Sequence, residues 1–202
     1  MSHMKQLCIG LFLFALLLSA QAQESYRIIE GTSCYIDGTS TLSDWIVTVK
    51  QIEGEVSLSK DFAQKGLPKP GALIPKVLIR MVVKSMDGGR GAVMNDKILG
   101  AFNEPANPYV VFEMTEGKIT NIKDEAAGTF NVHLKGKISM AGQSRVVEMD
   151  IEGKRVSPGV YSFAATYPVK MTDYGITPPS AMFGQIESGD EVKVRFNITV
   201  SK

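Results

Sequence analysis

Residues 129–154 read TFNVHLKGKISMAGQSRVVEMDIEGK, and this stretch decides the fold class. Large apolar side chains occupy every second position for most of its length, on both sides of the triplet Ala141-Gly142-Gln143. A period of two places successive side chains on opposite faces of a β-strand, and a short connection containing Gly is typical of a hairpin. The stretch therefore predicts two antiparallel strands, over residues 129–140 and 145–154, each with one apolar face.

The same alternation recurs along the rest of the chain. It predicts strands over residues 26–36, with a bend at Gly31, and over residues 44–58, 74–84, 109–115, 160–171 and 191–200. Residues 92–102 carry apolar side chains at helical spacing and predict one short helix. Residues 60–71, rich in Gly, Pro and Lys, are expected to form a protruding loop.

About eight antiparallel strands with one apolar face each can close into a barrel or stack as a sandwich. Several of the predicted strands exceed ten residues, whereas five or six residues are usual, and long strands are typical of tilted barrel staves. The predicted fold is therefore all-β, an eight-stranded antiparallel β-barrel with one short helix and a long lid loop.

The lid is the segment of residues 170–192, which joins the last two predicted strands. Pro178-Pro179 excludes a regular helix or a central strand, and three glycines permit tight turns. Its apolar side chains are Met171, Tyr174, Ile176, Met182 and Phe183. Since these would be exposed in an ordinary loop, the segment is expected either to cover an apolar interior or to pack on the outside of its own domain.

The predicted interior has two readings that residue types alone leave open. An eight-stranded barrel is wide enough either to be filled by its own side chains or to hold one slender ligand. Flexible methionines can repack around an irregular guest, but they also occur in ordinary cores. Those on the predicted apolar faces and in the lid are Met81, Met114, Met140, Met149, Met171 and Met182.

The first 22 residues predict export. Lys5 precedes about a dozen mostly apolar residues that end in Ser19-Ala20-Gln21-Ala22, the pattern of a secretory signal cleaved after Ala22. The run is shorter than the roughly 20 residues of a membrane-spanning helix, so no transmembrane segment is expected after cleavage. Met1-Ser2-His3 resembles a cloning remnant. We expect residues 1–22 to be a signal peptide with that remnant, and residues 23–202 to form one exported domain, with the periplasm as the expected compartment.

Charge and residue chemistry disfavour several classes of function. Residues 23–202 carry 21 basic and 21 acidic side chains, so no nucleic-acid partner is expected. They contain one cysteine, Cys34, and one histidine, His133, so neither a disulfide nor a metal site is expected. The sequence has no nucleophile elbow, phosphate loop or dinucleotide fingerprint. It therefore predicts a protein that is not an enzyme and that needs no cofactor.

Four motifs occur in an order known from one protein family. They are IDGTSTLSDW over residues 36–45, Met94-Asn95, GKISMAGQSR over residues 136–145 and MTDYGITPP over residues 171–179. In this order, between about Tyr26 and Val200, they resemble the YceI-like family of exported polyisoprenoid-binding proteins. The family often has His before the Asp-Trp pair, where this chain has Ser43, so a headgroup contact made by that histidine is absent or replaced.

The resemblance implies a lipocalin-like barrel that holds the polyprenyl chain or quinone tail of a lipid in an elongated apolar channel. It also implies which side chains contact the ligand. Carried over by position and strand face, the channel candidates are Trp45, Met81, Phe102, Phe112, Phe130, Leu134, Met140, Phe163, Tyr167 and Met171. The candidates at the mouth are Tyr174, Met182 and Phe183, and headgroup contacts are expected from Ser43, Asp44, Thr172 or Asp173.

The function implied by the resemblance is a non-catalytic binding or carrier protein for an amphiphilic isoprenoid lipid in the bacterial envelope. One alternative is an envelope protein-interaction module whose barrel is filled by side chains. A second alternative is a lipid cyclase or isomerase, which would need a polar group of displaced pKa inside the channel. The barrel edges and the lid leave a homodimer open, although no residue indicates one.

Overall fold

The computed structural model describes residues 23–63 and 66–202, so the predicted signal peptide and cloning remnant lie outside the described residues. The strands are β1 (Gln23–Ile28), β2 (Ser33–Gly38), β3 (Trp45–Val49), β4 (Ile52–Ser59), β5 (Lys76–Val82), β6 (Met86–Asp87), β7 (Tyr109–Asp124), β8 (Thr129–Met140), β9 (Gln143–Ser157), β10 (Val160–Lys170), β11 (Ser180–Ala181), β12 (Ile186–Glu187) and β13 (Glu191–Ser201). The helical segments are α1 (Ala92–Ala101) and the 3-10 turns η1 (Lys60–Ala63), η2 (Val83–Ser85) and η3 (Met171–Tyr174).

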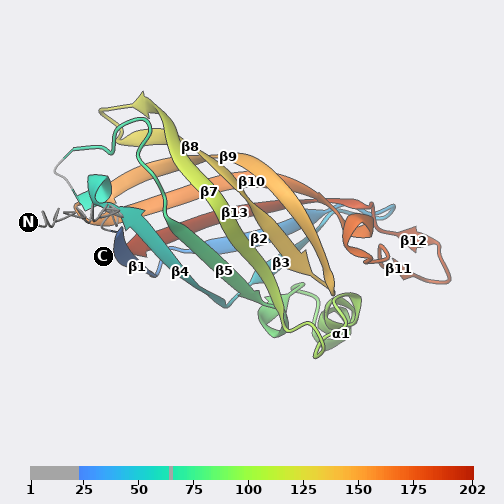
Figure 1. Cartoon of the computed structure of the whole chain (residues 1–202). Coiled ribbons are helices and arrows are strands. Elements are labelled where there is room, and N and C mark those ends of the chain that lie inside the picture. The colour runs from blue at the N-terminus through green and yellow to red at the C-terminus, as the bar shows by residue number, and fades with distance from the viewer. Residues whose placement is uncertain (1–22, 64–65) are drawn as a thin grey trace, which may run out of the picture.

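The strands close into an eight-membered antiparallel ring (Figure 1). Its order is β1-β4-β5-β7-β8-β9-β10-β13, and β13 pairs back onto β1. The short strands β2, β3 and β6 continue the sheet from β13 at one end of the ring. The predicted all-β barrel with one short α-helix is therefore confirmed. In the part of the chain that is described, no helix is long and apolar enough to cross a membrane.

Two ends of the barrel are distinguished below. The open end carries α1, η3 and the β11–β12 hairpin, and the closed end carries η1 and the C-terminus (Figure 1). Both α1 and η3 connect ring strands, since α1 precedes β7 and η3 follows β10. Every strand of the ring belongs to residues 23–202, so this part of the chain contains the complete barrel.

The first two predicted strands are each two strands. The chain turns at Gly31, which has a φ of 91°, so that β1 pairs with β4 whereas β2 pairs with β3 and β13. Residues 44–58 are broken between Val49 and Ile52. Before the break, the buried hydrophobic side chains are at odd-numbered positions, Val47 and Val49. After it they are at even-numbered positions, Val56 and Leu58, so the alternation changes phase at the break. The prediction of one continuous strand over residues 44–58 was wrong because it overlooked this change of phase.

Strand β7 runs to Asp124, well beyond the predicted end at residue 115. Its register with β8 shifts at Met114/Glu116, Ile119/Asn121 and Ile122/Asp124. Each bulge inserts an unpaired residue and interrupts the two-residue period that identifies a strand. The second half of β7 therefore lacks the alternation by which its first half was predicted.

In the segment predicted as a protruding loop, residues 60–63 and 66–71 fold back and fill the closed end. Phe62 of η1 and Pro68 are buried, and Phe62 is fully excluded from solvent. Its ring packs edge-on against Tyr161 and Phe130, with centroids 5.1 Å and 6.1 Å apart. The Tyr161 hydroxyl donates a hydrogen bond of 2.5 Å to the Phe62 carbonyl. Because the segment contains the apolar side chains Phe62 and Leu67, it gains more from burial than from exposure.

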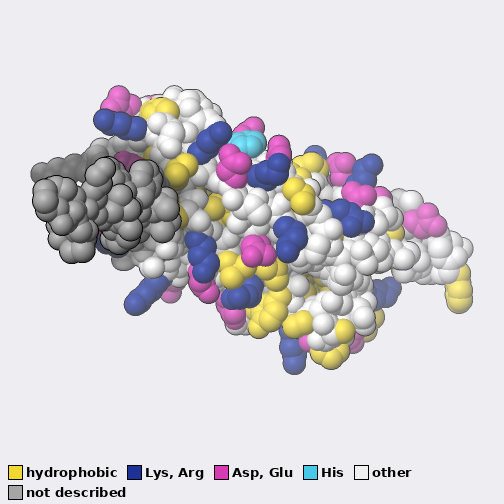
Figure 2. Space-filling model, viewed as in Figure 1, with side chains coloured by type: hydrophobic (Ala, Val, Ile, Leu, Met, Phe, Trp, Pro, Cys, Tyr) yellow, Lys and Arg dark blue, Asp and Glu magenta, His cyan; other side chains and the backbone are white. Residues whose placement is uncertain are grey.

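The outer face of the barrel carries charged pairs between neighbouring strands, and charges of both signs are interspersed over it (Figure 2). Lys135 on β8 pairs with Glu148 on β9 at 2.8 Å, which lowers the pKa of Glu148. His133, predicted on the solvent face, lies next to this pair, and its Nδ1 is 2.9 Å from Asp150 Oδ1. The alternation therefore has its polar side outward, as predicted.

Gly38 is expected to be essential for the position of Trp45, the only tryptophan. The two residues are cross-strand partners, and a Cβ at position 38 would lie 2.1 Å from Trp45 Cζ2. Gly38→Ala should displace the indole, break the 3.0 Å hydrogen bond from Trp45 Nε1 to the Thr39 carbonyl and cost about 1–3 kcal/mol of stability. Urea unfolding and a red shift of tryptophan emission measure both effects.

The matched control is Gly100→Ala in α1, where an added Cβ would meet nothing within 4 Å. Removing a helical glycine without a steric clash should stabilise the protein by about 0.5–1 kcal/mol. Unchanged emission and stability in Gly38→Ala would show that the indole does not depend on this glycine.

Candidate functional site

The barrel encloses an apolar cavity of about 200 Å³ that reaches the open end. Roughly 10–15 Å³ is enough to admit one water molecule, so this space is more than a packing void. It is lined by Ile36, Trp45, Val47, Val56, Leu58, Ile74, Val77, Ile79, Met81, Met86, Ile98, Ala101, Phe102, Val110, Phe112, Leu134, Ile138, Met140, Met149, Ile151, Phe163, Tyr167, Val169, Met171, Ile176, Pro179, Val192, Val194, Phe196, Ile198 and Val200. None of these side chains carries a charge.

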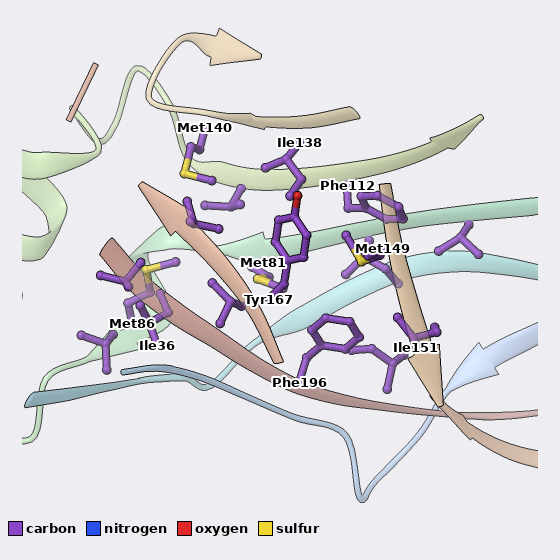
Figure 3. Close-up of a pocket in the computed structure, with 18 of the residues that line it drawn as sticks. Ile36, Met81, Met86, Phe112, Ile138, Met140, Met149, Ile151, Tyr167 and Phe196 are labelled. Carbon is purple, nitrogen blue, oxygen red and sulfur yellow. The ribbon is translucent and has the colours of Figure 1, made fainter. Parts of the chain in front are cut away.

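The inward faces of the ring strands build the wall, and Figure 3 shows aromatic, branched and methionine side chains converging on the cavity. On β10 the lining runs from Phe163 to Val169, which corresponds to about 20 Å of strand. Five of the lining residues are flexible methionines. They are Met81, Met86, Met140, Met149 and Met171. The cavity is therefore elongated, and much of its wall can adapt its shape to an occupant.

The structure brings nine of the predicted contact residues together in this wall. They are Trp45, Met81, Phe102, Phe112, Leu134, Met140, Phe163, Tyr167 and Met171. They come from six different elements and the residue that follows α1, so only the closed barrel makes them neighbours. Their contact with a ligand stays a prediction.

Four predicted residues lie elsewhere. Phe130 belongs to the aromatic cluster at the closed end, where its ring packs against Phe62, Tyr161 and Phe163. Tyr174 is buried beside the mouth but is not part of the cavity lining. Met182 and Phe183, predicted at the mouth, lie on the β11–β12 hairpin with their side chains exposed to solvent.

The residues that sequence reasoning missed are mainly aliphatic. Val56, Ile79, Ile151 and Ile198 line the cavity and lie on the predicted apolar faces or on strands that were predicted too long. The signal that could have found them is strand parity, which applies to every inward position and not to aromatic and methionine residues alone.

The open end is partly covered by two segments. Ile98, Ala101 and Phe102 reach the cavity from α1 and the residue after it, and Ile176 and Pro179 reach it from the lid. We call residues 171–179 the rim segment. The predicted lid is thus divided, because its first half lines the cavity whereas the β11–β12 hairpin extends away from the barrel (Figure 1).

Two carboxylates hold these covering segments in place. Asp190 accepts hydrogen bonds from the Thr172 backbone N–H at 2.9 Å and from its hydroxyl at 2.7 Å, and these bonds lower the pKa of Asp190. Asp87 pairs with Lys50 at 2.6 Å and accepts hydrogen bonds from the Gly89 N–H and the Asn95 amide. These contacts, that of Lys50 most, lower the pKa of Asp87 to about 2. Both carboxylates are therefore ionised at neutral pH and tie the covering segments to the barrel.

The wall contains two side chains with polar atoms, Trp45 and Tyr167. The Trp45 N–H is bonded to the Thr39 carbonyl. Figure 3 shows the Tyr167 hydroxyl pointing across the cavity toward Ile138. Tyr167 lies three residues before the end of β10, which corresponds to about 10 Å along the strand from its end at the open end of the barrel. The lining thus offers one hydroxyl near the open end and an apolar surface beneath it.

Of the four residues predicted to contact a headgroup, two already have partners. Thr172 is held by Asp190, as described above, and the Ser43 hydroxyl accepts a hydrogen bond of 3.3 Å from Arg90. Ser43, Asp44 and Asp173 are exposed, and none of the four lines the cavity.

The described residues that line the cavity include no cluster of titratable side chains. Tyr167 is the one lining residue with an ionisable side chain. Burial raises the pKa of the Cys34 thiol to about 12, and its sulfur lies 3.8 Å from that of Met81. Within residues 23–63 and 66–202, no three His, Cys, Asp or Glu side chains are grouped as metal ligands.

The sequence matches the family model described as YceI-like domain over residues 30–200. A search of curated proteins gave no significant match. Among solved structures, the Burkholderia cenocepacia protein BcnA superimposes with a TM-score of 0.63 at 16% identity, covering 84% of this chain and 96% of the other.

Two further solved structures share the fold. A polyisoprenoid binding domain from Saccharophagus degradans, implicated in plant cell wall breakdown, has a TM-score of 0.60 at 12% identity, covering 87% of this chain and 97% of that domain. A Campylobacter jejuni YCEI protein has a TM-score of 0.56 at 13% identity, covering 77% of this chain and 84% of the other. At these identities the likeness concerns the fold alone.

Proposed function

This chain belongs to the YceI-like domain family, and on that premise we propose that it binds one amphiphilic isoprenoid lipid, without catalysis, as a carrier in the bacterial envelope. The observation that carries the proposal is the elongated, uncharged cavity inside the barrel. The description of the Saccharophagus degradans domain as polyisoprenoid binding supports the choice of ligand class. The predicted signal sequence supports the compartment.

The cavity wall suits a branched hydrocarbon chain. Each methylene group removed from water gains about 0.8 kcal/mol, so a polyprenyl chain or a quinone tail can bind tightly with few polar contacts. Isoprenoid methyl branches make the chain irregular in width, and five methionines in the wall can adjust to that outline. Selectivity then depends on the length and shape of the cavity.

Tyr167 supports an orientation with the headgroup toward the open end. Its hydroxyl can donate a hydrogen bond to a carbonyl or hydroxyl oxygen of the ligand and can also accept one. Because the wall beneath Tyr167 carries no free polar side chain, the hydrocarbon part would lie between Tyr167 and the closed end. The ring of a quinone or the oxygen of a polyprenyl alcohol fits this arrangement.

The two alternative functions fit the structure less well. A barrel filled by its own side chains would leave no space of this size, so the cavity argues against a purely structural interior. A cyclase or isomerase would need an acid or a base beside the substrate. The wall supplies one ionisable side chain, that of Tyr167.

The test is native mass spectrometry of residues 23–202, purified without detergent from a bacterial host, followed by organic extraction of the bound material. We expect a discrete added mass in the lipid range with an isoprenoid fragmentation pattern, which would also identify the headgroup. The same spectra give the oligomeric state and so test whether the chain forms a homodimer. A ligand-free protein that also fails to take up added polyprenyl lipids would contradict the proposal.

A further inference from the structure

The hairpin at the open end presents two large apolar side chains to solvent. Strands β11 and β12 pair through Ser180–Glu187 and Ala181–Ile186, and Met182 and Phe183 lie in the turn between them. Phe183 is more exposed than in an extended reference peptide, at 110%, and Met182 is 63% exposed. Figure 2 shows hydrophobic atoms at this projecting end of the molecule. We call residues 180–186, which end before Glu187 at the base of this hairpin, the tip hairpin.

The turn of the tip hairpin uses residues that its backbone geometry disfavours. Met182 and Phe183 have φ angles of 50° and 55°, and the Gly184 N–H donates a hydrogen bond of 3.2 Å to the Ala181 carbonyl. Positive φ at both central residues defines a type I′ turn, for which Asn-Gly is the favoured pair. A large apolar residue in the left-handed region is an outlier of the kind that clusters at functional sites.

The tip hairpin is also free of charge. Residues 174–186 contain no Lys, Arg, Asp, Glu or His. The turn of residues 39–43 supports the base of the hairpin, since the Thr41 N–H donates to the Glu187 carbonyl at 3.0 Å and the Gly189 N–H donates to the Thr39 carbonyl at 3.0 Å. The hairpin is therefore a supported, uncharged projection whose far end is apolar.

Exposed apolar side chains gather at the open end beyond the hairpin itself. Among the described residues, ten large hydrophobic side chains are exposed, and six of them belong to segments at or next to the open end. Those six are Leu42, Ile46, Val93, Tyr109, Met182 and Phe183. The exposed large apolar side chains are therefore concentrated at the end of the barrel that contains the mouth of the cavity.

The tip hairpin continues directly from the cavity wall. Pro179 lines the cavity, Ser180 begins β11, and Met182 follows two residues later. A molecule that leaves or enters the mouth therefore passes beside the tip hairpin. Any surface that holds the tip hairpin also lies next to the mouth.

We propose that the tip hairpin inserts Met182 and Phe183 into the surface of a lipid bilayer and so docks the mouth of the barrel on the membrane. Apolar side chains that enter the headgroup and acyl boundary to about 5–10 Å are the usual device of proteins that lie on a bilayer. A narrow two-residue wedge suits this depth, whereas a stable protein interface buries roughly 800 Å² on each partner. In one respect the inference rests on the proposed function, because it names the bilayer as the source of the lipid.

The test uses residues 23–202 and vesicles of phosphatidylcholine. The variant Met182→Asn with Phe183→Gly removes both apolar side chains and supplies the favoured residues of a type I′ turn, so the hairpin keeps its geometry. The control, Val156→Ser, removes an exposed apolar side chain at the closed end. We expect the original protein and the control to float with the vesicles, and the double variant to bind at least tenfold less.

Salt provides a second readout. Because the tip hairpin carries no charge, vesicle binding should be unchanged at 0.5 M NaCl, where exposed charges are screened. Equal flotation of the double variant, or flotation that salt abolishes, would overturn the proposal. Absence of flotation by the original protein would also overturn it and would leave a protein partner for the tip hairpin as the alternative.

Lipid delivery separates this proposal from the function on which it rests. The probe is a polyprenyl alcohol with a nitrobenzoxadiazole label, added either in dilute ethanol or within the vesicles. Docking at the tip predicts equal uptake from ethanol by all three proteins, and transfer from vesicles at least tenfold slower for the double variant. Equal transfer would refute the delivery role. If the probe binds in neither format, the lipid-carrier function fails, while flotation still decides whether the tip docks.

Discussion

Replacing Phe112 by Asp is expected to lower the affinity for a polyprenyl lipid at least 100-fold while the barrel stays folded. Phe112 faces the cavity from the middle of the sheet, between its partners Ile79 and Ile138. In the lipid-free protein the new carboxylate can be hydrated by water within the cavity. A bound hydrocarbon chain expels that water, and an unpaired charge in an apolar site costs several kcal/mol.

The matched control for this prediction is Val111→Asp, one position along the same strand. Val111 lies on the outer face, opposite Arg80, so its carboxylate stays in water beside a cation. Native mass spectrometry and fluorescence titration with a labelled polyprenyl alcohol measure retention and affinity, and thermal unfolding confirms that both variants fold. If Phe112→Asp does not fold, Met149→Asp places the charge on another part of the wall. Undiminished binding by a folded cavity variant would show that the lipid does not occupy this space.

Phe62→Ala is expected to cause the largest loss of stability, about 3–5 kcal/mol. The Phe62 ring is fully buried and packs edge-on against Tyr161 and Phe130, so its removal leaves a void between large side chains. At roughly 2–4 °C per kcal/mol for a domain of this size, the melting temperature should fall by about 6–20 °C. Differential scanning calorimetry and urea unfolding measure the loss.

Phe183→Ala is the matched control, because it deletes the same atoms from a fully exposed position. Surface substitutions of this kind usually change stability by no more than about 0.5 kcal/mol. Similar losses for the two variants would mean that the closed end is not a packed core.

The barrel strands could be predicted where apolar and polar residues alternate without interruption. Residues 129–140 coincide with β8 because every second side chain is apolar and no bulge interrupts the strand. The bend at Gly31 was predicted but not the change of partner there, and the break after Val49 was missed, because alternation continues on both sides of each position. Whether such a segment bends or changes partner is decided by pairing with β4 and β13, which are distant in sequence.

The sequence predicts which side of a strand faces the interior of the barrel, but it does not predict how far from the mouth each residue lies. Phe130, Leu134 and Met140 share one side of β8, yet Leu134 and Met140 line the cavity whereas Phe130 is packed into the closed end. Strand parity determines the side of the sheet on which a residue lies. How far it lies from the mouth depends on strand tilt and on which loop folds back, here the segment that contains Phe62.

The tip hairpin shows where composition misleads. Met182 and Phe183 are apolar, so burial was expected, and the family resemblance implied a position at the mouth. The turn that joins β11 to β12 instead places both side chains outside the barrel. Backbone geometry of this kind depends on the supporting contacts from residues 39–41, more than a hundred positions away in the sequence.

The aromatic packing of Phe62, Phe130 and Tyr161 has a kinetic consequence for the proposed lipid cargo. Because one end of the barrel is filled by side chains, a bound lipid and an incoming lipid must both pass through the mouth at the open end. The bound lipid therefore has to dissociate before the second can enter, and a competitor cannot displace it from the closed end. Exchange should follow first-order kinetics, at a rate independent of competitor concentration, so residence time and not supply sets how often the cargo changes.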